Sequence, residues 1–472
     1  MPEERPSQRP RSLSATGSAG SRWFGPAWPI SVLLLGFPLW WLLGVSSFVL
    51  IMVAVPMAIR LVRMKKVFVP PAFGWWLLFL VCVALSSVML GVSAPGTLPS
   101  SFIGKLPGYT LRTLNYLAAT IAMLYVINTS ERELSTRRLV RMQGVFFVVV
   151  VVGGLVGTFL YKVEFTSPLE LVLPSSLTSH RFAQALVHPS VAQVQGVLGY
   201  ESPRPTAPFA YTNIWGNNLS LLMVWFVVAN WVWGGLRRRV FCGAVLAASV
   251  VPIVYSLNRG LWIGLLVALV YVGVRNALHG RIHVLFVFAV VTCGVMVAIV
   301  ASPLYDVIQE RLLHPHSNMA RENTSTAAVR AAVSSPVLGY GSTRTVVGSA
   351  QTIAVGRSAT CPQCGNAAIG GAGQLWLLLV AQGFLGVILY VGFFLRTMWT
   401  YRRDRSPVAV GAILVIGLGV VYLTVYGAAG TPLALYMLAV ALLWRQRRLS
   451  KQAAVERGEK TWRPVPAVAG AP

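Results

Sequence analysis

Apolar runs of about 20 residues recur along almost the whole chain and are separated by short polar segments. A helix of that length crosses the hydrocarbon core of a bilayer, so each run is a candidate membrane helix. Only 11% of the residues are charged, against about 25% in a soluble globular domain. The pattern predicts an all-α polytopic membrane protein of about twelve spans. They begin near Pro29, Ser46, Phe73, Leu111, Val145, Asn213, Val240, Leu261, Val284, Gln374, Val408 and Thr431.

The net charge of +26 would suit a nucleic-acid-binding protein, but the basic residues are not gathered into one domain. They come in bursts between the apolar runs, as expected for cytoplasmic loops under the positive-inside rule. This distribution excludes nucleic acid as a partner and predicts that both termini are cytoplasmic. The segments then assigned to the inside are 60–66, 130–141, 237–239, 275–283, 401–405 and 445–448, and each is basic.

Three regions follow from this topology. Residues 1–27 are expected to form a disordered basic cytoplasmic tail, 28–445 a transmembrane domain, and 446–472 a second cytoplasmic tail. Two large extracytoplasmic loops are predicted at about 162–210 and 304–371, and loops of this length usually serve binding or act as lids.

Within the second loop, residues 318–333 are predicted to form a helix that ends before Pro336 and a Gly-Tyr-Gly turn. The same loop carries Cys361 and Cys364, for which a local disulfide is the first interpretation. A zinc site would need two more ligands. We therefore expect no bound metal.

Arginines gather on the outer side, and Arg259 lies in the very short link between two spans. There it can reach a phosphate, which the planar guanidinium binds with two parallel hydrogen bonds, or it can anchor a helix end by snorkelling. Arg204 lies near the end of the first outer loop on a proline-stiffened segment. Two such arginines could clamp a pyrophosphate. The neighbouring aromatic and amide residues suit either an interfacial belt with helix caps or a sugar-binding surface: Tyr211, Asn213, Trp215 and Asn217.

Four segments in this order, "RPTAPFAYTNIWGNNLSLL" (204–222), "YSLNRGLWIGLLVALV" (255–270), "AAVRAAVSSPVLGYGSTR" (327–344) and "GQLWLLLVAQGFLGVILY" (373–390), carry a family resemblance. Together they resemble the O-antigen ligase and polymerase superfamily, and look most like its actinobacterial branch. The resemblance implies a GT-C-like arrangement of membrane helices with a large outer loop late in the chain.

The activity implied by this resemblance is a metal-independent inverting glycosyl transfer outside a bacterial cytoplasmic membrane, without a cofactor. The donor would be a polyprenyl-diphosphate-linked glycan, the acceptor a glycan or lipid-linked sugar, and membrane lipids would surround both. By motif, Arg204 and Arg259 would hold the diphosphate leaving group. Ligase and polymerase activity are not distinguished by the sequence.

The chain departs from the family where the ligases carry a histidine-asparagine pair, because residues 369–376 contain no histidine. Gln374 and Trp376 would shape the sugar pocket there, but neither can serve as a base. His316 and Glu322, in the second loop, are the candidate bases, with His314 and Asp306 as further possibilities. Arg344, in the glycine turn, is a candidate catalytic residue, and Arg321 and Arg330 on the loop helix would help to close the site.

Two other functions remain open. A twelve-helix transporter or flippase of lipid-linked glycans would be expected to have polar residues at mid-membrane, related halves and short outer loops, and the chain shows none of these clearly. A non-catalytic role in envelope assembly is the third candidate, because the expected histidine is missing.

Overall fold

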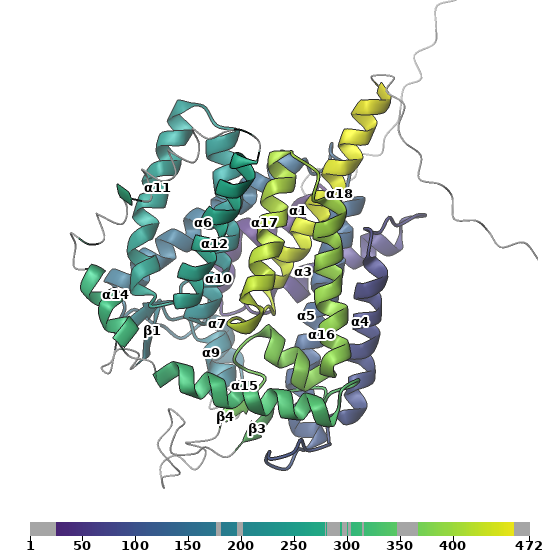
Figure 1. Ribbon diagram of the computed structural model, residues 1–472, viewed down its shortest axis with the longest axis vertical. Coiled ribbons are helices and arrows are strands. Elements are labelled where there is room, and N and C mark those ends of the chain that lie inside the picture. The colour runs from purple at the N-terminus through teal and green to yellow at the C-terminus, as the bar shows by residue number, and fades with distance from the viewer. Residues whose placement is uncertain are drawn as a thin grey trace, which may run out of the picture.

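A computed structural model describes residues 25–175, 181–195, 202–278, 280, 293–294, 300, 304–313, 316–346 and 367–456 (Figure 1). These residues are mainly helical, in agreement with the predicted fold class, and the protein is embedded in a membrane. Among them, six helices are long and apolar enough to cross a bilayer. They are α5 (Phe102–Asn128), α6 (Thr136–Phe159), α11 (Leu236–Tyr255), α12 (Arg259–Ala277), α16 (Gln374–Tyr401) and α17 (Pro407–Val421), the last extended by a 3-10 turn, η3 (Tyr422–Thr424).

The remaining predicted spans correspond to shorter or more polar helices, except the span near Val284, which lies outside the described residues. The first span is divided at Gly36 into two short helices. These elements are α1 (Trp28–Leu35), α2 (Phe37–Leu42), α3 (Val49–Val62), α4 (Phe73–Leu85) with η1 (Ser86–Met89), α10 (Thr212–Val227) with η2 (Val228–Val232), and α18 (Thr431–Glu456).

Two helices extend further than the apolar runs predict. α5 begins at Phe102 rather than near Leu111, because the Ser101 side chain accepts a hydrogen bond from the Gly104 N–H and caps the first turn. α18 continues to Glu456, so the predicted tail from 446 starts as helix. Its Arg, Gln, Lys and Ala residues are good helix formers and carry the helix past the apolar run.

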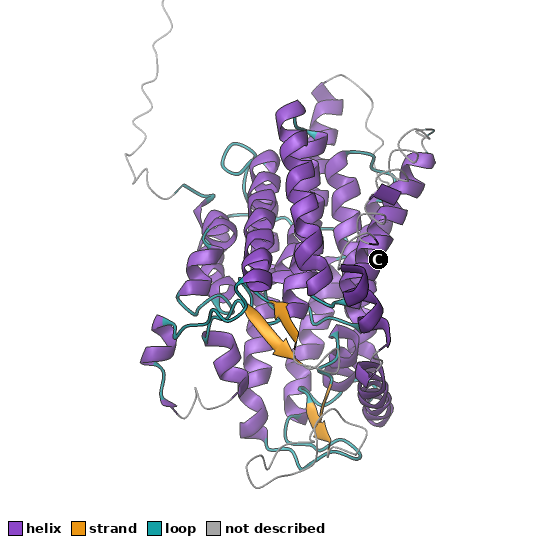
Figure 2. Cartoon of the chain, turned by 90° about the vertical axis from the view of Figure 1, so that its left-hand side faces the viewer, coloured by secondary structure: helices purple, strands orange, loops and turns teal. Residues whose placement is uncertain are grey.

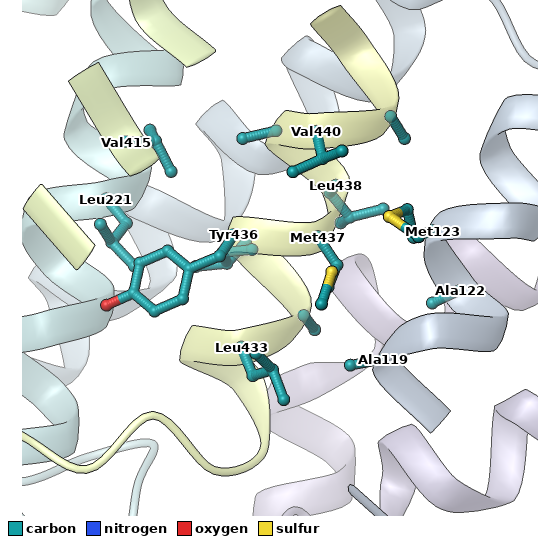
Figure 3. Packing of buried hydrophobic residues seen from close by; sticks show 14 of the residues in the cluster. Ala119, Ala122, Met123, Leu221, Val415, Leu433, Tyr436, Met437, Leu438 and Val440 are labelled. Carbon is teal, nitrogen blue, oxygen red and sulfur yellow. The ribbon is translucent and has the colours of Figure 1, made fainter. Parts of the chain in front are cut away.

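The core of the bundle is built around α18 (Figure 3). Its residues from Leu433 to Leu443 are all buried. In the close-up, Met437 and Leu438 lie toward Met123 of α5, and Tyr436 lies beside Leu221 of α10. The apolar start of α18 is thus surrounded by other helices, whereas α11 and α12 lie at the periphery. The exposed residues of α12 include Ile263, Leu266 and Val270, as expected for a lipid-facing surface.

The predicted inner segments lie together at one end of the bundle. Arg60 pairs with Glu133 and Arg445 with Glu131, each at 2.6 Å, so the last turn of α3 and the middle of α18 both contact the segment after α5. Arg275 likewise donates to the backbone carbonyl of Asp404. The strands and the predicted outer segments lie toward the opposite end (Figures 1 and 2).

The first predicted outer loop forms short helices and a two-stranded antiparallel sheet, and the second forms two helices and a second small sheet. The helix predicted at 318–333 is confirmed as α15, whereas α14 was not predicted. The elements are α7 (Pro168–Val172), α9 (Arg181–Val187), β1 (Ala192–Gln195), β2 (Ser202–Pro205), α14 (Leu304–Leu313), α15 (His316–Ser334), β3 (Arg344–Val346) and β4 (Ala367–Ile369).

The glycine turn after α15 docks onto a break in α16. Gly339 and Gly341 have positive φ angles of 60° and 72°, which confirms the predicted turn. Gly383 inside α16 has φ 65° and ψ −165°, which interrupts the helix. Two carbonyls of the last turn before this break, those of Val380 and Ala381, accept hydrogen bonds from Tyr340 and Gly341, both at 2.8 Å. The glycine turn thereby satisfies backbone groups of a membrane helix.

Candidate functional site

The hairpin of β1 and β2 carries Arg204 to the link between α11 and α12. The hairpin lies against α6, where a side chain at Gly157 would come within 2.2 Å of the Val191 carbonyl oxygen. Arg204 is only 9% exposed, and its Nε donates a hydrogen bond to the Ser256 carbonyl oxygen at 2.6 Å. Arg204 is therefore held at the residue that ends α11.

Arg259 begins α12 on the other side of the same link. Leu257, between the two helices, is a buried non-glycine residue with φ 52°, a left-handed conformation that costs about 1 kcal/mol or more. Asn258 occupies the N-cap position of α12, yet its side chain makes no capping hydrogen bond. Arg204, through its bond to Ser256, and Arg259, as the first residue of α12, thus belong to the same link beside a helix N-terminus, which favours negative charge.

The Asn258 side chain is used instead to join three segments. Its Nδ2 donates to Oδ1 of Asn213 on α10 at 3.4 Å, and its Oδ1 accepts a hydrogen bond from the Tyr426 hydroxyl. Asn258 and Tyr426 are buried, while Asn213 is half-buried. Asn213, predicted as substrate-binding, therefore does lie beside the link that carries Arg259.

The polar face of α10 continues into the bundle. The Tyr436 hydroxyl donates to Asn217 Oδ1 at 3.1 Å, and the Tyr422 hydroxyl donates to Ser220 Oγ at 3.0 Å. Asn217 is 1% exposed, so it lies among packed helices, away from the outer surface where we predicted sugar binding. The reason is helical spacing, because Asn217 lies one turn deeper than Asn213 on the same face.

Trp215 also has a packing role that differs from the predicted sugar contact. Its indole is fully buried, and its Nε1–H donates to the Val150 carbonyl oxygen of α6 at 3.1 Å. Tyr211, by contrast, precedes α10 and is half-buried, and burial raises the pKa of its hydroxyl. Of the two aromatic residues, only Tyr211 keeps an accessible surface for a ligand.

Gln374 lies at the centre of a second set of hydrogen bonds. Its Nε2 donates to the Tyr116 hydroxyl oxygen at 2.9 Å, and its Oε1 accepts from the Ala428 N–H at 3.1 Å. Its backbone N–H donates to the Tyr426 carbonyl oxygen at 2.8 Å. Gln374 is 1% exposed, so the side chain holds the segment 425–430 against α5 instead of lining an open pocket as predicted.

We expect Gln374→Leu to lower the free energy of unfolding by about 2 kcal/mol, because the buried Ala428 N–H and Tyr116 oxygen each lose their partner. Thermal unfolding of purified protein in detergent measures the change. Gln452→Leu, at an exposed position of α18, is the control. Equal stability of the two variants would show that the Gln374 side chain is not structural.

Trp376 follows Gln374 on α16 and is half-buried. Its Nε1–H donates to the Thr424 carbonyl oxygen at 2.9 Å, so this side chain joins α16 to η3. The indole ring retains accessible surface, which is compatible with the predicted sugar contact.

The guanidinium N–H groups of Arg344 are used inside the protein and are not directed at a ligand. The guanidinium is fully buried, and burial lowers its pKa from the ordinary value. All the hydrogen bonds that its side chain donates, 2.8 to 3.2 Å long, go to backbone carbonyls. The accepting residues are Met89, Leu90, Val92, Tyr340, Ser342 and Thr343. The predicted catalytic role gives way to a structural one, because Arg344 ties the glycine turn to the end of η1 and the residues that follow it.

The remaining predicted residues belong to α15. Glu322 and Arg330 are exposed there, and within the described part of the chain no hydrogen bond or ion pair joins either side chain to Arg204 or Arg259. His316 begins α15 and Arg321 follows in it, but their side chains lie outside the description, as does His314 entirely.

Arg112 of α5 is a candidate that the sequence pattern did not single out. It is turned into the protein, and its Nη1 donates to the Gly341 carbonyl oxygen at 3.3 Å. It lies one helical turn before Tyr116, the partner of Gln374. A usable signal was present, because Arg112, Asn115 and Tyr116 have the spacing of one helix face at the start of an apolar run.

No protein-family model, no curated protein and no solved structure matches the chain. The site is therefore defined by its own residues: the link 256–259 with Arg204, and the amide and tyrosine network beside it.

Proposed function

We propose that the protein is a glycosyltransferase that moves a glycan from a polyprenyl-diphosphate carrier to a glycan or lipid-linked acceptor. It acts on the extracytoplasmic face of a bacterial cytoplasmic membrane, with about twelve spans and both termini inside. The hydrogen bond from Arg204 to Ser256 carries the proposal, because it brings the two arginines expected to bind the diphosphate to one short link.

The chemistry of the link suits a diphosphate leaving group. Negative charge grows on the diphosphate as the glycosidic bond breaks, so fixed cations and the N-terminus of α12 stabilise the transition state more than the ground state. The buried bond to Ser256 fixes Arg204 in advance, which avoids reorganisation during the reaction. Asn213 and Tyr211 lie on the adjoining surface and would orient the sugar.

The test is transfer by purified protein in nanodiscs that contain a lipid-diphosphate oligosaccharide. We expect release of polyprenyl diphosphate that depends on an added glycan or lipid-linked acceptor, detected by mass spectrometry. The heat-denatured protein is the control. An intact lipid-diphosphate substrate with every acceptor tried would contradict the proposal.

A transporter or flippase of lipid-linked glycans is the second candidate, and the break in α16 favours it. Interrupted membrane helices often form the binding sites of transporters, and Gly383 interrupts α16 beside the buried Gln382. The nanodisc assay separates the two candidates, because a transporter moves its substrate between leaflets without breaking the glycan-phosphate bond.

A further inference from the structure

Two cationic side chains, Lys105 and Arg112, lie in the first part of α5, and Arg112 is hydrogen-bonded to the glycine turn that precedes Arg344. One face of α5 carries the two cations Lys105 and Arg112, with the uncharged Tyr109 between them. These three side chains are half-buried, while the neighbouring Leu106 is exposed. This face turns toward the glycine turn that follows α15, where Arg344 lies. A β-carbon at Gly108, between Lys105 and Arg112, would lie 4.0 Å from Ser342 Oγ, so this part of α5 lies beside the segment that leads to Arg344. The cluster of Lys105, Arg112 and Arg344 is built from other segments than the link that carries Arg204.

The members of the cluster differ in their hydrogen bonds. The guanidinium nitrogens of Arg344 all donate hydrogen bonds to backbone carbonyls. Arg344 therefore contributes positive charge to the cluster but no hydrogen-bond donor for a ligand. Arg112 donates once, from Nη1 to the Gly341 carbonyl oxygen at 3.3 Å. Among the described residues, the other N–H groups of Arg112 and the ammonium group of Lys105 have no hydrogen-bond acceptor. Donors on two of the three cations are therefore available to a ligand.

No carboxylate of the neighbouring chain balances these charges. Residues 5–130 and 323–403 include every segment that forms the cluster, and neither stretch contains an aspartate or glutamate. The ion pairs of the described residues involve other side chains. Like charges held together in a partly buried site repel one another, and an external anion would relieve this cost.

We propose that Lys105 and Arg112 bind the phosphate group of a ligand, with Arg344 adding its positive charge from behind. A phosphate offers several acceptor oxygens, which match the planar donors of an arginine and the point charge of a lysine. The phosphate can belong to a membrane lipid headgroup or be free in solution. The inference concerns binding at α5 and does not depend on glycosyl transfer at the link.

The experiment measures binding to the full-length protein in a nonionic detergent. Inorganic phosphate and dioctanoyl phosphatidic acid are titrated separately, with dioctanoyl phosphatidylcholine as the zwitterionic control, and the rise in unfolding temperature gives an apparent affinity. We expect saturable stabilisation by at least one phosphate probe. Lys105→Gln and Arg112→Gln should each weaken it about tenfold, because each removes one charge-assisted hydrogen bond. Lys162→Gln, which removes an exposed charge, should change it less than about twofold.

The two probes identify the source of the phosphate. Stabilisation by inorganic phosphate supports a soluble anion, and stabilisation by phosphatidic acid alone supports a lipid headgroup. If Arg112→Gln does not fold, Lys105→Gln carries the test, since the described structure gives its ammonium group no hydrogen bond to lose. Absence of saturable stabilisation by either probe overturns the proposal. Unchanged affinity of both glutamine variants for the phosphate probe also overturns it. The proposal is likewise overturned if Arg259→Lys alone weakens phosphate binding, because this would locate the phosphate at the link.

Discussion

Replacing Arg259 with lysine is expected to lower the rate of glycan transfer about 100-fold, with little change in the yield of folded protein. Lysine keeps the positive charge but loses the planar pair of donors that binds two phosphate oxygens at once. Arg259 is the first residue of α12, so its side chain stands where the leaving diphosphate would meet the helix N-terminus. The measurement is the initial rate of polyprenyl diphosphate release in nanodiscs.

Arg396→Lys is the matched control, because Arg396 is exposed on α16 and belongs to neither arginine site. It should transfer glycan at the rate of the unaltered protein. Full activity of Arg259→Lys would eliminate the two-point contact with the diphosphate and would favour snorkelling as the role of Arg259.

Replacing Gly264 with valine is expected to destabilise the protein by about 3 kcal/mol or more. A β-carbon at Gly264 would lie 1.8 Å from the Tyr422 hydroxyl oxygen, and a branched side chain adds two further carbons to this occupied space. Tyr422 would have to leave its hydrogen bond to Ser220, and it also packs on Tyr426 with ring centroids 4.8 Å apart. The variant therefore disturbs the network that ends at Asn258.

Thermal unfolding in detergent measures this loss, and Gly243→Val provides the comparison. Gly243 lies on an exposed face of α11, where an added β-carbon meets no atom within 4 Å. Valine is a better helix former than glycine, so the control should be as stable as the unaltered protein or slightly more so. Similar unfolding temperatures for the two variants would mean that α12 shifts to accommodate the side chain.

The sequence predicts the helices well because the length of an apolar run follows directly from bilayer thickness. It also predicts that Arg204 and Arg259 belong to the same end of the bundle, and the link 256–259 lies beside both Arg204 and Asn213. The roles of buried polar residues were harder to predict. Trp215, Asn217 and Gln374 have side chains that suit a sugar pocket, yet their partners come from α6, α18 and α5, which are distant in sequence.

Arg344 shows the same limit more clearly. Its acceptors are mostly carbonyls of residues 89–92, about 250 positions earlier in the sequence. No residue pattern in either segment predicts that the two segments pair. A carbonyl oxygen is present at every residue, so the sequence does not indicate which ones lack partners. Arg112 could have been found, because its spacing to Tyr116 is a local helical pattern.

The docking of the glycine turn on α16 has a consequence for protein engineering. The carbonyls of Val380 and Ala381 depend on N–H groups that belong to the outer loop. A membrane helix without those donors would expose polar backbone to hydrocarbon. The loop is therefore not an exchangeable module, and a chimera that imports a foreign segment at 336–344 must import its own version of α16 as well.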